Sequence, residues 1–180
     1  MKLLLHTCCA PCMIYPLDKL RERNYEVEAY FYNPNIHPLE EYERRKVAVE
    51  NYSLLMHIPL VLGGYNPDEF FEAVRQVPEN PGRCPVCWYL RLKKTANMAK
   101  LLECQGFTTT LLVSPYQDQQ AIIKIGSDIA KKEGLVFYYE DFRTGFREAH
   151  NKAHNMGIYC QKYCGCRYSE EERCRKSEKH

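Results

Sequence analysis

The chain has 180 residues, 45% of them hydrophobic, so its length and composition predict one domain with an ordinary core. Lys and Arg total 25 against 23 for Asp and Glu, and a net charge of +2 excludes a general electrostatic attraction to nucleic acid or membranes. Any anionic partner must therefore meet a local patch of positive charge.

The lengths of the apolar runs and the number of cysteines indicate the cellular compartment. No run approaches the roughly 18 consecutive apolar residues of a membrane-spanning helix. The apolar run at residues 2–6 is too short for a signal peptide. We therefore expect a soluble cytoplasmic protein with no membrane partner. Ten cysteines in a reducing compartment favour metal binding or catalysis over structural disulfides.

The predicted elements alternate between strand and helix along the chain. Strands are predicted at residues 2–6, 27–32, 58–62, 107–113 and 135–139. A first helix is predicted after Cys12, and others over 39–53, from 67 to about 74 and over 118–132. Two more are predicted from Cys84 and Cys87 to about 102, and after the loop at 141–145 to about 155. Residues 78–85 hold three prolines and a glycine and are predicted to form a loop.

Strands that alternate with helices predict an α/β fold, a parallel sheet with helices on both faces. We expect a single catalytic domain over residues 1–180, with a cysteine-containing C-terminal segment at 160–180. Ligand sites in such folds lie beyond the carboxyl ends of the strands. Four candidate loops follow strands and should meet there: residues 8–12, 33–37, 114–116 and 141–145.

Seven cysteines form three groups along the sequence: Cys8, Cys9 and Cys12; Cys84 and Cys87; Cys164 and Cys166. Soft thiolates select zinc, copper(I) or iron-sulfur clusters. Two C-x-x-C pairs alone would indicate structural zinc, and one pair at a helix start would suffice for a thioredoxin-like dithiol. Seven thiols exceed the four that zinc or a cubane cluster takes, which favours a redox metal centre, most simply an iron-sulfur cluster.

Six motifs in this order resemble those of the QueH-type epoxyqueuosine reductases, over almost the whole chain. They are residues 5–12, 32–38, 83–87, 109–115, 140–143 and 163–166. The resemblance implies the last step of queuosine synthesis, in which the epoxide of epoxyqueuosine at the tRNA wobble position is reduced to the cyclopentene. It also implies an architecture like that of the adenine nucleotide alpha-hydrolases, or PP-loop proteins. The Ser-Gly-Gly-x-Asp-Ser loop is missing, so we do not expect ATP binding.

The same resemblance implies a [4Fe-4S] cluster with the seven grouped cysteines as metal ligands, and suggests an additional adjacent iron ion. Which cysteines bind the cluster and which a second metal stays open. Cys104, Cys160 and Cys174 lie outside the family pattern, so we expect structural roles for them. The reaction needs two electrons and two protons, so an external electron donor is expected as a partner.

Candidate proton donors and substrate contacts lie on the loops beyond the strands. His37, Tyr32 and Asp141 are the candidate proton donors. Asn33, Asn35, Ser114, Tyr116 and Arg143 are the candidate substrate-binding residues. Two alternatives stay open: His37 as a loop histidine bonded to backbone, and Asp141 with Arg143 as an internal ion pair.

A tRNA anticodon loop would be held by phosphate contacts and by stacking of its bases on aromatic or guanidinium planes. Basic clusters at residues 44–46, 91–94 and 162–176 and fourteen tyrosines could supply both, although most of these charges are expected on solvated helix faces. Two other functions stay open. One is a zinc-stabilised RNA-binding module without redox catalysis, and the other is a metal-free dithiol oxidoreductase.

Overall fold

A computed structural model describes residues 1–77 and 82–177 of the chain. Residues 78–81 of the predicted loop and the last three residues of the predicted C-terminal segment lie outside the described part. Cys84 and Pro85, which were expected in that loop, lie in the first turn of a helix instead. No helix of the described residues is long and apolar enough to cross a membrane.

The centre of the fold is a five-stranded parallel sheet in the order β3-β2-β1-β4-β5. Its middle strand β1 carries Leu3, Leu4 and Leu5, all fully buried, because helices cover both faces of the sheet. The strands are β1 (Lys2–His6), β2 (Glu26–Phe31), β3 (Leu60–Leu62), β4 (Gly106–Thr109) and β5 (Val136–Phe137).

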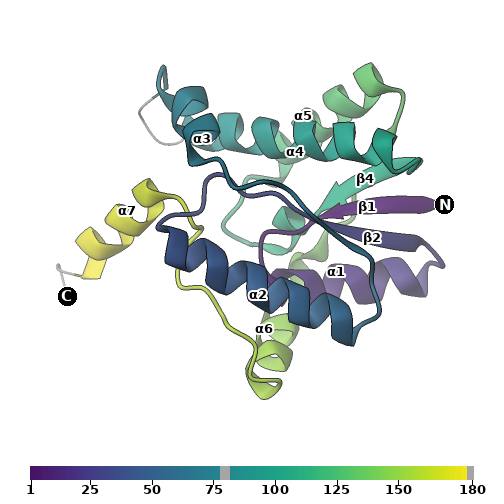
Figure 1. The fold of residues 1–180 in the computed structure, drawn as a ribbon, viewed down its shortest axis with the longest axis horizontal. Helices are drawn as coiled ribbons and strands as arrows, with labels where there is room; N and C mark the ends of the chain where they lie inside the picture. The colour runs from purple at the N-terminus through teal and green to yellow at the C-terminus, as the bar shows by residue number, and fades with distance from the viewer. Residues whose placement is uncertain (78–81, 178–180) are drawn as a thin grey trace.

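The helices form two layers, with α1, α2 and α6 on one face of the sheet and α3, α4 and α5 on the other (Figure 1). This arrangement confirms the predicted α/β fold with helices on both faces. The bounds are α1 (Ala10–Glu22), α2 (Leu39–Leu55), α3 (Pro67–Val74), α4 (Arg83–Leu101), α5 (Gln119–Glu133), α6 (Phe146–Asn155) and α7 (Arg167–Ser177), with two 3₁₀ turns, η1 (Thr110–Val113) and η2 (Phe142–Gly145).

The predicted strand 107–113 is wrong in its second half. The strand ends at Thr109, whose side-chain oxygen accepts a hydrogen bond from the Leu111 backbone N–H at 3.2 Å. That side-chain bond starts the η1 turn, because a threonine hydroxyl offers the backbone an alternative to the strand ladder. The turn brings Thr110 next to the loop after β1.

The strand order places a topological switch point between β1 and β4. From β1 the chain winds to β2 and β3 on one side, and then returns to β4 and β5 on the other side. Open α/β sheets bind ligands in the crevice beyond the strand ends at such a point. The loop after β1 carries Cys8, and η1 follows β4, so both border this crevice.

Candidate metal centre

Three thiols meet at the start of α1. Cys8 and Cys9 lie in the loop after β1, and Cys12 lies in the first turn of the helix. The three sulfur atoms lie within 4.8 Å of one another, a spacing that could hold a metal ion, and those of Cys8 and Cys9 are 3.7 Å apart. Cys9 and Cys12 are buried and Cys8 is partly buried. We call these residues the three-thiol group.

Polar side chains from distant segments bind this group. The Thr110 hydroxyl donates to the Cys8 sulfur at 3.2 Å and accepts from the Cys8 backbone N–H at 3.1 Å. The Gln161 amide donates to the Cys9 sulfur at 2.9 Å and to the Cys12 sulfur at 3.6 Å. The sulfur atoms are therefore acceptors, as thiolates or metal-bound sulfurs would be.

The three sulfur atoms have unequal proton affinities. Hydrogen bonds from the Cys12 and Cys9 thiols, and then from Thr110, lower the pKa of Cys8 well below its usual value. Burial raises the pKa of Cys9, and hydrogen bonding to Cys8 and then to Cys9 raises that of Cys12. A metal ion bound by these thiols would displace their protons.

The other four grouped cysteines surround an adjacent space, which we call the Cys84 cavity. Cys84 and Cys87 come from the first two turns of α4, and Cys164 and Cys166 from the segment before α7. All four line a cavity of about 340 Å³. Burial raises the pKa of Cys84 to about 11 and that of Cys87 to about 12.

A small cavity of about 50 Å³, the Cys8 cavity, is lined by Cys8, Cys12 and Cys164. Cys164 also lines the Cys84 cavity, so the two groups of thiols border one continuous region of the fold. The structure therefore brings the seven predicted metal ligands to one edge of the sheet, with three within 4.8 Å and four around the next cavity.

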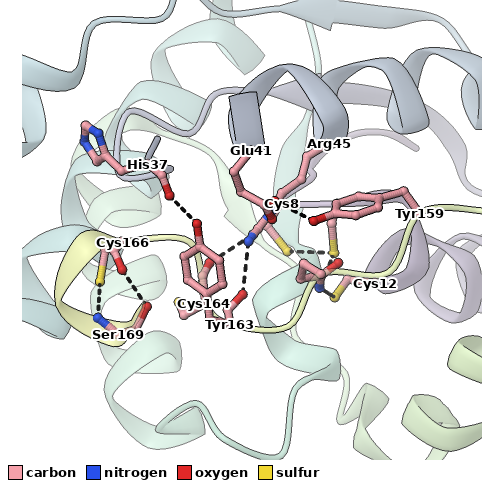
Figure 2. A network of polar contacts seen from close by, with 12 residues as sticks. Cys8, Cys12, His37, Glu41, Arg45, Tyr159, Tyr163, Cys164, Cys166 and Ser169 are labelled. Atoms are coloured by element: carbon pink, nitrogen blue, oxygen red, sulfur yellow. Dashed lines mark hydrogen bonds and ion pairs between the residues drawn. The ribbon is translucent and has the colours of Figure 1, made fainter. Parts of the chain in front are cut away.

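Arg45 of α2 ties the C-terminal cysteine segment to this region (Figure 2). Its guanidinium donates to the Glu41 carboxylate at 2.7 Å, to the Cys164 carbonyl at 3.1 Å and to the Tyr163 carbonyl at 3.0 Å. Only 1% of the Arg45 side chain and 7% of the Glu41 side chain are exposed. The Tyr159 hydroxyl donates to the second Glu41 oxygen, so the buried carboxylate is satisfied on both sides.

A second buried cation, Arg91 of α4, lines both the Cys8 cavity and the Cys84 cavity. Its Nε donates to the Cys87 carbonyl at 3.3 Å, while its buried Nη2 has no hydrogen-bond partner among the described residues. Burial opposes the charge, but the thiols of Cys87, Cys164 and Cys8 outweigh it and raise the pKa of Arg91. Two buried guanidinium groups therefore face the thiols, and their positive charge suits a thiolate-bound centre.

Of the three predicted proton donors, His37 lies beside the loop that carries Cys164 and Cys166. The His37 backbone N–H donates to the Gly165 carbonyl at 2.7 Å, and its carbonyl accepts from the Tyr163 hydroxyl. Its ring points away from Cys8 and Cys12 and packs on Phe71, with centroids 4.7 Å apart (Figure 2). His37 thus holds the Cys164–Cys166 loop through its backbone, and a proton-donor role for its ring stays a prediction.

Tyr32 and Asp141 are each bound to another side chain. The Tyr32 hydroxyl donates to the Glu69 carboxylate, and burial, then this bond, raises the pKa of Tyr32. Asp141 accepts from the Arg143 guanidinium at 2.8 and 2.5 Å and caps η2 through the Arg143 backbone N–H. Neither Asp141 nor Arg143 lines the two thiol cavities, so the internal ion pair is present and roles in the reaction stay predictions.

The predicted substrate-binding residues on the other loops lie closer to the thiols. Asn33 is buried and donates to the Thr7 carbonyl at 2.9 Å, which fixes the loop after β2 to the loop after β1. Asn35 lines the Cys84 cavity, and its buried amide has no hydrogen-bond partner in residues 1–77 and 82–177. Ser114 and Tyr116 line a third cavity of about 410 Å³ that also includes Cys12 and Cys164.

Sequence reasoning missed the residues that organise the thiols. Most charges of the basic clusters were expected on solvated helix faces, and Arg45 and Arg91 are exceptions, since each is 1% exposed. Their spacing held a signal, because Arg45 follows Glu41 by four residues and Arg91 follows Cys87 by four, so each pair shares one helix face. Nothing in the sequence indicated Gln161.

Comparisons with known proteins identify relatives over nearly the whole chain. A family model described as "Epoxyqueuosine reductase QueH" matches residues 3–172. A protein of that name from Dehalococcoides mccartyi is 36% identical over 173 residues, covering 96% of this chain and 94% of its own. One from Thermotoga maritima is 36% identical over 185 residues, covering 98% and 93%.

A solved structure shares the fold alone. The predicted subunit of a tRNA methyltransferase from Methanocaldococcus jannaschii matches with a TM-score of 0.56 at 9% sequence identity. The match covers 84% of this chain and 74% of that one. It supports the predicted α/β architecture.

Proposed function

This chain belongs to the epoxyqueuosine reductase QueH family, and from that premise we propose that it reduces the epoxide of epoxyqueuosine in tRNA at a thiolate-bound iron-sulfur centre. The observation that carries the proposal is the three-thiol group at the β1/β4 switch point, with sulfur atoms within 4.8 Å. Four further cysteines and two buried arginines surround the same region.

The residues present fit a thiolate-bound metal centre. Soft sulfur ligands and two nearby cations suit an iron-sulfur cluster, because such a cluster with its thiolates carries net negative charge. The unpartnered Nη2 of buried Arg91 supports this fit, since a buried donor without an acceptor costs about 1–3 kcal/mol unless an anionic group satisfies it. Cys8, Cys9 and Cys12 would hold the cluster, with a fourth ligand and any second iron on Cys84, Cys87, Cys164 and Cys166.

Reduction of the epoxide to an alkene consumes two electrons and two protons and releases the oxygen as water. When bound, the metal centre would supply the electrons one at a time from an external donor and polarise the epoxide oxygen. Neighbouring side chains of this chain hold the cysteine ligands in position for the reaction. Thr110 and Gln161 fix the sulfur atoms by hydrogen bonds, and Arg45 holds the Cys164 loop against them.

The rest of the proposal follows from the substrate. With a tRNA substrate the reaction would take place in the cytoplasm, and the anticodon loop would reach the switch-point crevice. Residues 1–180 would act as a single catalytic domain, because the segment 160–180 supplies Gln161, Cys164 and Cys166 to the site. Cys104 and Cys160 would keep structural roles: the Cys160 sulfur lies 3.5 Å from the Ile158 carbonyl oxygen, the acceptor of its thiol.

Anaerobic purification with iron and sulfide analysis tests the proposal, followed by turnover of epoxyqueuosine-containing tRNA with a chemical reductant. We expect about four or five irons and about four sulfides per chain. Cys9→Ser should lose most of this iron, because it removes a central sulfur of the three-thiol group. Cys104→Ser is the matched control, since Cys104 is buried but lies outside the family pattern. This variant should retain iron and turnover.

The same iron, sulfide and turnover measurements distinguish the reductase from the two alternative functions. One zinc, no sulfide and no turnover would refute the reductase and leave a zinc-stabilised RNA-binding module. Turnover that persists after complete iron removal would instead support a dithiol oxidoreductase.

A further inference from the structure

The third cavity near the thiols, which we call the Phe146 cavity, has a volume of about 410 Å³. Such a volume lies within the range of pockets that bind small organic groups, about 300–1,000 Å³. Cys12 and Cys164 line one part of it, and Phe146 and His150 of α6 line another. The cavity thus joins the metal-binding thiols to an aromatic surface.

Aromatic rings form one wall of this cavity. Phe146 and His150 lie one helical turn apart, with ring centroids 4.2 Å apart and an interplanar angle of 42°. Tyr116, on the loop after η1, stands edge-on to Phe146 at 6.0 Å and 86°. Tyr116 is 84% exposed, so its ring is open to a stacking partner.

The electrostatics of the cavity suit an RNA strand. Lys162 lines it next to Tyr163, and Arg173 lines it from α7, so positive side chains accompany the aromatic wall. Glu172 is also present there. Cationic side chains beside aromatic rings are the usual means of binding a single-stranded nucleotide, with rings stacking on the base and cations near the phosphates.

The Cys84 cavity fits this role less well. Its tryptophan, Trp88, is 5% exposed, and its ring N–H donates to the Gln117 side chain at 2.8 Å. Trp88 therefore offers no open face for stacking, while four thiols occupy the walls. The two cavities share Tyr116 and Cys164, but four thiols line the Cys84 cavity, whereas Phe146, His150 and Lys162 line the Phe146 cavity and not the Cys84 cavity.

We infer that the Phe146 cavity binds the modified purine-like base after it leaves the anticodon stack, with the base stacked on Tyr116 and its epoxide-bearing ring directed toward Cys12 and Cys164. This inference rests on the proposed function, which supplies the substrate. Tyr116 acts as a binding residue in it. Stacking on one ring tolerates many bases, so selectivity for the epoxide comes from the thiol side of the cavity.

Binding of a defined RNA to Tyr116 variants tests the inference. The probes are an end-labelled tRNA that carries epoxyqueuosine and the same tRNA with guanosine at that position, measured by fluorescence anisotropy without oxygen. Tyr116→Ala should weaken binding of the epoxyqueuosine tRNA about tenfold, the loss typical of one stacked base. Tyr116→Phe keeps the ring and should bind within about twofold of the unmodified protein.

Tyr89→Ala is the matched control, because Tyr89 is 50% exposed on α4 and does not line the Phe146 cavity. It should leave binding and iron content unchanged. In turnover assays Tyr116→Ala should raise KM more than it lowers kcat. Iron content equal to that of the unmodified protein would show that the metal centre is intact.

Equal binding by Tyr116→Ala and the unmodified protein would overturn the inference. A loss in Tyr116→Phe as large as in Tyr116→Ala would also overturn it, because the ring would then not be the binding element. If the unmodified protein binds the tRNA but does not reduce it, the proposed function fails while the Tyr116 comparison still decides whether the Tyr116 ring binds the RNA. Absence of tRNA binding by the unmodified protein would overturn both.

Discussion

The Arg45–Glu41 pair gives the sharpest prediction on stability. Arg45→Met keeps the length of the side chain and removes its charge, which leaves the Glu41 carboxylate in a site where 7% of it is exposed. It also removes the donors to the Tyr163 and Cys164 carbonyls. Removing one partner of a buried ion pair costs about 3–5 kcal/mol, a large part of the roughly 5–15 kcal/mol of a typical domain.

A double variant separates the cost of the stranded Glu41 charge from the cost of the lost hydrogen-bond donors to the Tyr163 and Cys164 carbonyls. Glu41→Gln with Arg45→Met removes both charges and keeps an acceptor for the Tyr159 hydroxyl, so it should recover at least about half of the loss. Arg45→Lys keeps the charge but loses the planar fork that reaches three acceptors, and should fall between the unmodified protein and Arg45→Met.

Urea unfolding of the reduced, metal-free proteins, followed by circular dichroism without oxygen, measures these free energies of unfolding. A loss below about 1 kcal/mol in Arg45→Met, the size typical of a surface pair, would refute the reasoning. A double variant no more stable than Arg45→Met would show that the stranded Glu41 charge is not the source of the loss.

Three further predictions concern other parts of the chain. The single tryptophan, Trp88, lines the Cys84 cavity, so anaerobic addition of Fe²⁺ should quench its fluorescence, and unchanged emission would place the metal elsewhere. Gly165 has φ = +120° and a Cβ there would lie 3.0 Å from Arg45 Nη1, so Gly165→Ala should lower iron retention with little change in helix content by circular dichroism. The Arg23 guanidinium lowers the pKa of Glu140, so the pair stabilises the fold above the carboxyl's usual pKa of 4.5 and this contribution disappears as the pH falls below it. Glu140→Gln should therefore make acid unfolding less steep, and an identical acid unfolding curve would contradict this.

Much of the site could be predicted because parallel strands deliver their loops to one edge. The strand predicted at residues 2–6 places Cys8, Cys9 and Cys12 at that edge, and the strand predicted at 107–113 places Ser114 and Tyr116 there, although its last four residues form the η1 turn. Neither step needs tertiary detail, since alternation of strand and helix already implies a common edge.

The remainder depends on contacts between segments far apart in sequence. Arg45 lies in a stretch of charged residues typical of a solvated helix face, but the segment before α7 packs against it and accepts its hydrogen bonds. Helix α7 was not predicted, because its sequence has no apolar periodicity. Gln161 reaches Cys9 from the other end of the chain, a contact that no local pattern indicates.

The position of Cys164 and Cys166 late in the chain sets an order for biosynthesis. β1 and the three-thiol group are synthesised before residues 160–166, and the sheet can form around them as β2 and β4 follow. The segment that Arg45 anchors, with Gln161, Cys164 and Cys166, leaves the ribosome only after all five strands of the sheet. A metal centre that used thiols of both segments would therefore be completed only after this later segment has packed against Arg45.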